Sequence, residues 1–417
     1  MNASKQIMSG RIFFESREFR LDSVATGRHA QRAIARRNAM CSPIFRGRIC
    51  TRRFEKRLEA SQISNPLRWR PVNFVTDPIS QSSTRIGFET QPKRHALHGL
   101  SQEVIVAVAT VITAIFCVVF VKSFANSANI LLLMRSVSIL GVLAVGMSIV
   151  VIGRGIDLSQ VAVMVVATAW ALTLSAGGMP PWSALILGLL LAALCGLWNG
   201  CAIAYIGISP LFATLASGIF IYGVGRWFLF ANINTYVPDQ AKALLVLGQG
   251  AVLGVPVPVI IFFCVLGIGW FVFTRFIIGR KIYALGDNIE TARITGLSYR
   301  TIITVQYIGS AAVAYLAGLM AAGTAAAVSA DTFNSTLLFD VLLIVVLGGI
   351  SLSGGRGTML GILAGTALIG TLMNAMLLLD VEMDVQSIIK SVVLLVAIAI
   401  DRRLHPRNEE TARQGDL

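Results

Sequence analysis

The sequence predicts an all-α membrane protein with about ten transmembrane helices, some of them short or broken. Three observations support this fold class. Of the 417 residues, 55% are apolar and only 13% are charged, a composition typical of polytopic membrane proteins. The apolar residues gather in runs long enough to cross a bilayer. The loops between the runs divide into a basic set and a set with few basic residues, as expected for the two sides of a membrane.

The predicted spans are apolar runs of roughly 20 residues, or fewer where a helix is broken or tilted. The break at 207–210 is either a boundary between two spans or a bend within one. The ten runs are 104–121, 130–152, 158–176, 182–206, 210–231, 255–277, 301–322, 338–350, 358–379 and 385–401.

Basic residues predict which loops face the cytoplasm. With the N-terminus inside, ten spans place both termini in the cytoplasm. The loops and tail on that side then hold eleven basic residues, whereas the outer loops hold two, which is the positive-inside pattern. The inner residues are Arg154, Arg275, Arg280, Lys281, Arg293, Arg300, Arg356, Arg402, Arg403, Arg407 and Arg413, and the outer ones are Lys122 and Lys242.

Charge also divides the chain into parts. Residues 1–97 hold 19 Lys and Arg against 7 Asp and Glu, whereas the remaining residues hold 16 against 14. We therefore expect a basic, disordered N-terminal extension at 1–97, a transmembrane domain at 98–401 and a cytoplasmic tail at 402–417. Because the excess charge belongs to the extension, we expect no nucleic-acid partner for the body of the protein.

The extension itself has several interpretations. It lacks a secretory signal, because no apolar segment typical of one follows its first basic residues. A disordered cytoplasmic tail and the product of a start codon placed too early are the leading interpretations. An Arg-rich organellar targeting segment is one alternative, and a region that binds nucleic acid or anionic lipid is another.

Cysteine and histidine form no metal or catalytic pattern in this sequence. The six cysteines have no ligand spacing, and the four histidines, at positions 29, 95, 98 and 405, lie outside the apolar runs. No Ser-His-Asp or Cys-His set falls within the spans. We therefore expect no metal, no cofactor and no catalytic residue, and a chain that is not an enzyme.

A polar break, Gly155-Ile156-Asp157-Leu158-Ser159, interrupts two apolar runs. Broken helices are tolerated in a membrane where they line a polar cavity, so Gly155, Asp157 and Ser159 are candidates for a translocation path. The alternative is that Asp157 or Ser159 simply caps the helix that begins near residue 158.

Further path candidates lie in other spans. The glycine-dense stretch 348–357 follows a membrane run and lacks the Gly-Lys-Ser/Thr of a phosphate-binding loop. We interpret it as a bend or a close helix contact beside the path, with Gly349 and Ser351 as candidates. Asn199 and Asn374 lie near the ends of apolar runs, where each either bonds across helices or contacts a solute.

Charged residues are scarce inside the predicted spans. Lys390 lies about five residues inside the last run, where it either snorkels outward or pairs with an acidic residue. The acidic residues considered for it are Asp380, Glu382 and Asp384. No aligned set of acids crosses several spans, which disfavours ion-coupled transport.

The polar stretch 279–300 lies between two long apolar runs. It is too basic to cross a bilayer easily, so we expect it on the cytoplasmic side. Glu290 to Ala292 predict a short helix, and Gly296 predicts its end. A short cytoplasmic helix between two membrane spans is a feature that a soluble partner protein can bind.

Residues from about 130 to 401 resemble the membrane permease of bacterial ABC importers of the ribose, galactose, arabinose and autoinducer type. The segments that carry the resemblance are short, but their order and spacing together are specific. They are Gly155-Ile156-Asp157-Leu158-Ser159, the stretch 209–215, Gly279 through Gly286-Asp287-Asn288 to Gly296, the stretch 346–357, and Ile388-Ile389-Lys390.

The resemblance implies a site that couples the chain to an ATPase. In such permeases a cytoplasmic Glu-Ala-Ala-x-x-x-Gly loop docks into a cleft on the ATPase subunit, and this sequence keeps the pattern with Thr291 in place of one alanine. Three features depart from the family: Arg154 stands where its members commonly have glycine, Gln160-Val161-Ala162 follows Ser159 where they commonly have Val-Gly, and the basic extension is long. The implied coupling residues are Asn288, Glu290, Ala292 and Gly296.

The resemblance also implies partners and an activity. It predicts a multi-pass subunit of the bacterial inner membrane that translocates a small neutral solute, above all a sugar. The implied partners are ABC ATPase subunits that hydrolyse ATP, a second permease copy or homologue, and a periplasmic solute-binding protein. The alternatives are a permease for branched-chain amino acids or nucleosides, an ion-coupled secondary transporter, and a membrane scaffold without transport.

Overall fold

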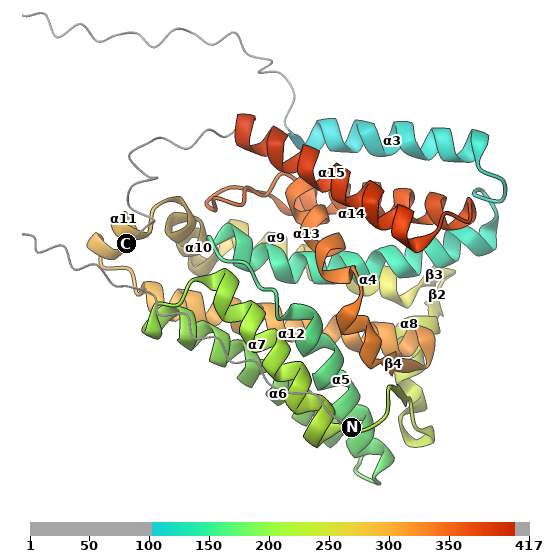
Figure 1. Ribbon diagram of the computed structural model, residues 1–417, viewed down its shortest axis with the longest axis horizontal. Helices are drawn as coiled ribbons and strands as arrows, with labels where there is room; N and C mark the ends of the chain where they lie inside the picture. Colours follow the sequence, from blue (N-terminus) through green and yellow to red (C-terminus); the bar gives the residue numbers. More distant parts are fainter. Residues whose placement is uncertain (1–101, 405–417) are drawn as a thin grey trace, which may run out of the picture. The chain divides into compact units, whose positions relative to one another are not determined.

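The computed structural model describes residues 102–404, and the described part is a bundle of helices (Figure 1). Each of the ten predicted apolar runs coincides with one helix, so the polytopic all-α fold is confirmed. These helices are α3 (Gln102–Phe120), α4 (Ser127–Ile152), α5 (Gln160–Ala176), α6 (Pro181–Cys201), α7 (Pro210–Val224), α9 (Val257–Arg275), α12 (Tyr299–Ala325), α13 (Leu337–Leu347), α14 (Met359–Leu378) and α15 (Met383–Leu404).

The lengths of these helices agree with the expectation of short and broken spans. Among the described residues, seven helices are long and apolar enough to cross a membrane, while α5 and α13 are shorter apolar helices. The predicted extension at 1–97, residues 405–417 of the predicted tail and the four histidines lie outside the described residues.

The remaining elements are small and belong to the connections. Strand β1 pairs antiparallel with β4, and β2 pairs antiparallel with β3. The elements are the π-helical turns η1 (Ala202–Ile206) and η2 (Gly225–Leu229), the 3-10 turns η3 (Asp239–Leu244) and η4 (Ala330–Asn334), the short helices α8 (Leu245–Gln249), α10 (Ile277–Asp287) and α11 (Ile289–Ile294), and the strands β1 (Asn234–Tyr236), β2 (Ala251–Val252), β3 (Val255–Pro256) and β4 (Ala327–Ser329).

Local sequence signals set several helix starts. Pro181 and Pro210 occupy the first turns of α6 and α7, where a missing N–H costs nothing because that group has no partner within the helix. Thr358 caps α14 by accepting a hydrogen bond from the Gly361 N–H at 3.1 Å. Gly207, with φ of 83°, ends η1 just before Pro210, so the break at 207–210 is a boundary between two helices.

Helix α12 is the central element of the bundle, and it packs against α4, α5, α6 and α8. Gly196 and Gly200 of α6, four residues apart, face the α12 backbone. A Cβ at Gly200 would lie 2.6 Å from the Thr304 Cα atom, so only glycine allows the two helices to come this close. This is the close approach that small residues four apart permit in membrane helices.

The predicted inner loops lie at one end of the bundle and the predicted outer loops at the other. In Figure 1, α10 and α11 lie at the end opposite β2, β3 and β4. At the α10 end, the Gly355 N–H donates to the Ile152 carbonyl at 2.8 Å, and the Arg300 guanidinium lies 5.4 Å from the centre of the Tyr205 ring. Loops from four connections that the charge pattern assigned to the same side therefore meet.

Candidate coupling and translocation site

Asp157 lies at the centre of a buried polar cluster where α4 gives way to α5. The residue is only 1% exposed. Its Oδ1 accepts hydrogen bonds from the Ser159 backbone N–H at 3.1 Å and the Ser159 hydroxyl at 2.6 Å, and its Oδ2 accepts one from the Ser310 hydroxyl at 2.9 Å. The Asn199 side-chain amide donates to the Ser159 hydroxyl oxygen at 2.7 Å. The cluster therefore ties the break between α4 and α5 to α6 and α12.

The backbone just before α5 is held by side-chain hydrogen bonds. Ser159 takes the N-cap position, but its side chain makes no capping bond. Asp157 accepts the Ser159 N–H instead, just ahead of the helix. From α7, the Thr214 hydroxyl oxygen accepts the Leu158 N–H at 3.1 Å. Asp157 therefore closes a turn ahead of α5 and belongs to a wider polar cluster, whereas no side chain caps the first N–H groups of the helix.

Gly155 completes this cluster by allowing a close contact. A Cβ at this position would lie 2.6 Å from the Tyr307 hydroxyl oxygen, which is too close for any side chain. Four of the predicted path residues thus come together, and all four are buried in this conformation. They are Gly155, Asp157, Ser159 and Asn199.

The other three path candidates lie outside this cluster. Gly349 and Ser351 belong to the loop that follows α13; Gly349 has φ of 79°, and the Ser351 and Ser353 hydroxyl oxygens lie 2.8 Å apart. Asn374 of α14 exchanges two amide hydrogen bonds with Asn129 of α4, at 2.9 and 3.0 Å. Such a reciprocal pair fits the interpretation of Asn374 as a bond across helices.

The predicted coupling loop forms a helix with both ends capped. The Asn288 side chain accepts the Thr291 N–H at 2.9 Å and caps α11 at its start. Gly296, with φ of 79°, follows the helix; its N–H donates to the Arg293 carbonyl at 3.1 Å, and the Leu297 N–H donates to the Ala292 carbonyl at 3.0 Å. These two bonds form a Schellman motif, which requires a left-handed residue at the Gly296 position.

One side of α11 is buried and another is open. Ala292 is 3% exposed and packs into the main apolar core, whereas Ile294 is 83% exposed. Glu290 is half-buried in the first turn of the helix. A large apolar side chain on an otherwise polar connection is a suitable contact for a partner protein.

Helix α10 connects α11 to the break between α4 and α5. Gly286 near the end of α10 lies so close to the Ile152 carbonyl and the Gly355 N–H that a Cβ would overlap both. The Tyr283 hydroxyl donates to the Gly357 carbonyl at 2.6 Å. The coupling loop, the break and the glycine-rich loop after α13 are therefore in direct contact through backbone atoms.

Lys390 has a partner that the sequence analysis did not identify. Its Nζ lies 2.9 Å from Oδ1 and 3.0 Å from Oδ2 of Asp340 on α13, and 2.8 Å from the Thr336 hydroxyl. The expected partners Asp380, Glu382 and Asp384 were therefore wrong. The sequence does contain a signal for this ion pair, because Asp340 is a charged residue inside an apolar run and such a residue needs a partner. What the sequence lacked was the packing of α15 on α13.

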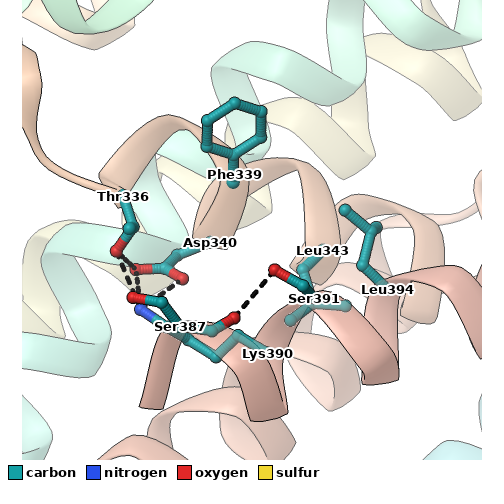
Figure 2. Close-up of a pocket in the computed structure, with 8 residues that line it drawn as sticks. All are labelled: Thr336, Phe339, Asp340, Leu343, Ser387, Lys390, Ser391 and Leu394. Carbon is teal, nitrogen blue, oxygen red and sulfur yellow. Dashed lines mark hydrogen bonds and ion pairs between the residues drawn. The ribbon is translucent and has the colours of Figure 1, made fainter. Parts of the chain in front are cut away.

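A small cavity of about 70 Å³ surrounds this ion pair, and Figure 2 shows its walls. We call it the Asp340 pocket. Its lining combines the charged pair with hydroxyl groups and apolar side chains. The lining residues are Thr336, Phe339, Asp340, Leu343, Ser387, Lys390, Ser391 and Leu394.

Metal-ligating side chains do not gather within 102–404. No group of three or more His, Cys, Asp or Glu side chains that could hold a metal ion occurs among these residues. Four cysteines of this part are free thiols, at positions 117, 195, 201 and 264. The polar clusters described above are built from hydroxyl, amide and carboxylate groups together with the Lys390 ammonium.

Comparison with known proteins places the chain in a family. Residues 129–398, about two thirds of the chain, match the family model described as the permease component of the branched-chain amino acid transport system. The chain is similar to the ribose import permease protein RbsC of Bacillus subtilis, with 32% identity over 76% of this chain and 97% of that protein.

Two further relatives agree with this assignment. The ribose import permease protein RbsC of Haemophilus influenzae is 33% identical over 67% of this chain and 87% of its own length. The fructose import permease protein FrcC of Rhizobium meliloti is 28% identical over 75% of this chain and 88% of its own. No solved structure gave a significant match. The extent of these matches, together with the polytopic helical fold, shows that the chain belongs to this family of multi-pass membrane permease components of ABC import systems.

Proposed function

We propose that this chain forms the membrane path of an ATP-driven importer for a neutral sugar. ATP hydrolysis takes place on a separate ABC ATPase that binds α11, and an external binding protein delivers the sugar. A second permease copy or homologue completes the path. The relatives named above carry ribose and fructose in their names, and the D-allose permease AlsC of Escherichia coli, 29% identical over 71% of this chain, adds a third sugar.

The observation that carries the ATPase proposal is the position of α11. It is a short helix with both ends capped and an exposed Ile294, and α10 links it to the break between α4 and α5 through backbone contacts at Gly286. The contacts at Gly286 offer a packed route by which a force applied to α11 by a bound ATPase would reach the break that holds Asp157. Alternating access depends on packed elements of this kind, which make different contacts in the outward-facing and inward-facing states.

The first experiment tests which side of the membrane α11 faces. Thr291 on α11 is exposed, so a Thr291→Cys variant in a background without native cysteines presents an accessible thiol. A thiol reagent that cannot cross membranes should modify it only after the cells are permeabilised. Modification of intact cells to the same extent would place α11 outside and exclude an ATPase at this helix.

The second experiment tests the substrate and the energy source. We expect cells that carry the permease together with its ATPase and binding-protein partners to take up D-ribose, D-fructose or D-allose. An ATPase subunit that cannot hydrolyse ATP should abolish this uptake, and collapse of the ion gradients should spare it. Uptake of L-leucine instead would favour the branched-chain amino acid alternative, which the description of the family model supports. Uptake that depends on the ion gradient alone would establish the secondary transporter.

A further inference from the structure

The Asp340 pocket lies near the middle of the membrane. Helix α13 has 11 residues, so it is about 16 Å long. This is roughly half of a hydrocarbon layer of about 30 Å. Its C-terminal end leads into the loop that contacts α10, so its N-terminal end, at Thr336, lies deep within the layer. The position of Lys390 on α15 also indicates a site deep within the layer. Lys390 lies seven residues after Met383, the first residue of that helix, and is therefore about 10 Å from the start of the helix.

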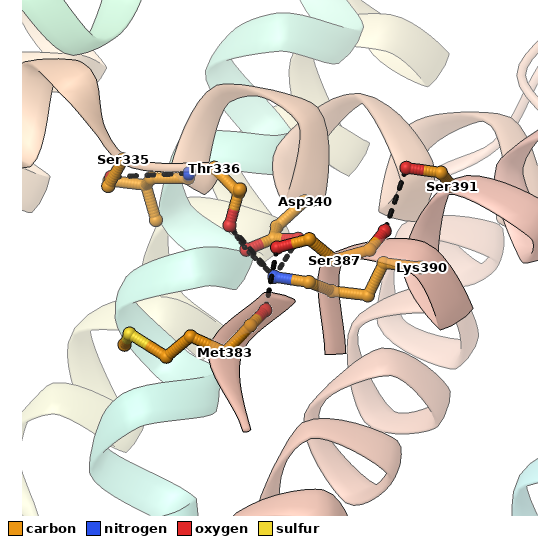
Figure 3. Close-up of polar contacts among 8 residues, drawn as sticks. Ser335, Thr336, Asp340, Met383, Ser387, Lys390 and Ser391 are labelled. Carbon is orange, nitrogen blue, oxygen red and sulfur yellow. Dashed lines mark hydrogen bonds and ion pairs between the residues drawn. The ribbon is translucent and has the colours of Figure 1, made fainter. Parts of the chain in front are cut away.

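The ion pair in the pocket is internally complete. The Lys390 ammonium has three N–H donors, and they meet the two Asp340 carboxylate oxygens and the Thr336 hydroxyl oxygen (Figure 3). The Thr336 hydroxyl lies 3.3 Å from Asp340 Oδ2, to which it donates. Lys390 is 8% exposed and Asp340 is 3% exposed. The pocket is therefore neutral, and its ammonium donors are used within it.

What remains free in the pocket is a set of hydrogen-bond acceptors. The Ser387 and Ser391 hydroxyls donate to the Met383 and Ser387 carbonyls at 2.8 and 2.7 Å, which leaves the lone pairs of both oxygens available. A carboxylate offers about four acceptor positions, and Lys390 and Thr336 occupy three of those on Asp340. A ligand that donates hydrogen bonds fits this set, whereas a carboxylate ligand finds no unused side-chain donor in the pocket lining.

A role in packing alone does not account for these residues. A buried ion pair is seldom more stabilising than two well-packed apolar side chains, and ionisable groups deep in a membrane are costly. Half-helices that begin within the membrane commonly carry the solute sites of transporters. The apolar wall formed by Phe339, Leu343 and Leu394 provides a surface for the carbon skeleton of a small ligand.

We propose that the Asp340 pocket is a solute-contact site of the translocation path, where Ser387, Ser391 and Asp340 accept hydrogen bonds from the hydroxyl groups of a neutral polyhydroxylated solute. This inference rests on the proposed transport function and adds a location and a selectivity. An amino acid would bring a carboxylate that competes with Asp340 for Lys390, so the pocket favours sugars over amino acids.

The test asks whether the pocket is in contact with water and solute. Ser391→Cys and Val392→Cys are introduced separately into a cysteine-free background. Val392 is 53% exposed, lies one residue further along the same helix and does not line the pocket. Cells are treated with a charged, impermeant methanethiosulfonate reagent, both at rest and during uptake of the sugar that they import among D-ribose, D-fructose and D-allose.

We expect at least tenfold faster modification of the cysteine at position 391 than of that at 392 in one of the two conditions, and slower modification when the sugar is saturating. Equal slow modification of both variants in both conditions would overturn the proposal, because the pocket would then face lipid or a second copy. Modification without any protection by the sugar would overturn it too. The cysteine-free parent should still import the sugar by ATP hydrolysis, and loss of that uptake would count against the transport function alone.

A kinetic measurement gives an independent outcome. Replacing both serines, as Ser387→Ala with Ser391→Ala, should raise the KM for uptake about three- to tenfold, as expected for one or two neutral hydrogen bonds. The matched control is Thr274→Val, because Thr274 is also exposed on a membrane helix and donates to the carbonyl four residues earlier at 2.7 Å. An unchanged KM in the double variant, or an equal rise in the control, would contradict the proposal.

Discussion

The backbone N–H of Gly355 donates a hydrogen bond to the carbonyl oxygen of Ile152 at 2.8 Å. Ile152 is the last residue of α4, so its carbonyl would otherwise lack a partner at the helix end. The bond joins the break after α4 to the loop after α13, and Gly286 of α10 packs against both atoms. The loop that holds α10 and α11, the break after α4 and the loop after α13 therefore share one packed junction.

Gly286→Ala should disturb this junction. The added methyl would overlap the Ile152 carbonyl and the Gly355 N–H, which are backbone atoms that cannot rotate away. We expect a loss of about 1–3 kcal/mol of stability, typical of overpacking. Thermal unfolding of the purified protein in detergent measures this effect. Gly309→Ala on α12 is the control, because a Cβ there meets nothing within 4 Å, and an unchanged melting curve for Gly286→Ala would refute the contact.

Arg154→Gly should stabilise the protein. Arg154 has φ of 68°, a left-handed conformation that costs a residue with a Cβ about 1–2 kcal/mol. Glycine adopts it freely but loses about 0.5–1 kcal/mol of backbone entropy on folding, so the net gain should be roughly 0.5–1 kcal/mol. Chemical denaturation of the two proteins side by side measures the difference. Arg154→Ala, which keeps the Cβ, should show no such gain.

Substitutions at Gly296 should rank by their tolerance of a positive φ. Space at this residue is open, so backbone conformation alone decides the outcome. Asparagine adopts the left-handed region more readily than β-branched residues, and we expect Gly296→Asn to retain more ATPase binding than Gly296→Val. Co-purification of the two variants with the partner ATPase provides the comparison. Equal binding by both would show that the capped end of α11 does not matter for docking.

The Asp340–Lys390 pair predicts a double-mutant result that separates folding from transport. Lys390→Met alone leaves an unpaired carboxylate in the membrane and should cost about 3–5 kcal/mol. Adding Asp340→Leu removes that charge and should restore most of the stability. Transport should stay impaired, because the Asp340 carboxylate acceptor is gone and only the Ser387 and Ser391 hydroxyls remain. Full recovery of sugar uptake in the double variant would show that the pair serves packing only.

Tyr283 predicts a pH-dependent contribution to stability at the α10 junction. Burial, and to a smaller extent the negative charge of Glu103, raise the pKa of Tyr283 above its ordinary value of 10.0. A raised pKa favours the protonated form in the folded state, so this contribution is present at neutral pH and is lost as the pH rises through the folded value. Tyr283→Phe also loses the bond to Gly357 and should cost about 0.5–1.5 kcal/mol at pH 7. The difference in unfolding free energy between the unsubstituted protein and Tyr283→Phe should shrink above pH 10. A difference that stays constant with pH would contradict the assignment.

The positions of the helices were predictable because the signal for a membrane span is local. Length and apolarity along the chain suffice to mark each run, so the ten runs coincide with ten helices. The short helix α11 was also predictable, since Asn288 at its start and Gly296 after its end are short-range capping signals. The roles of these residues in coupling stay predictions.

Contacts between distant segments depended on how the helices pack. Asp157 meets Ser310, and Lys390 meets Asp340, because α12 and α13 bring those residues to the right depth and rotation. Apolar helices carry little sequence information about their neighbours, since lipid and protein surfaces are alike in polarity. The sequence by itself therefore determined the spans and the short helix α11, whereas the tertiary structure alone decided which polar side chains within the membrane became partners.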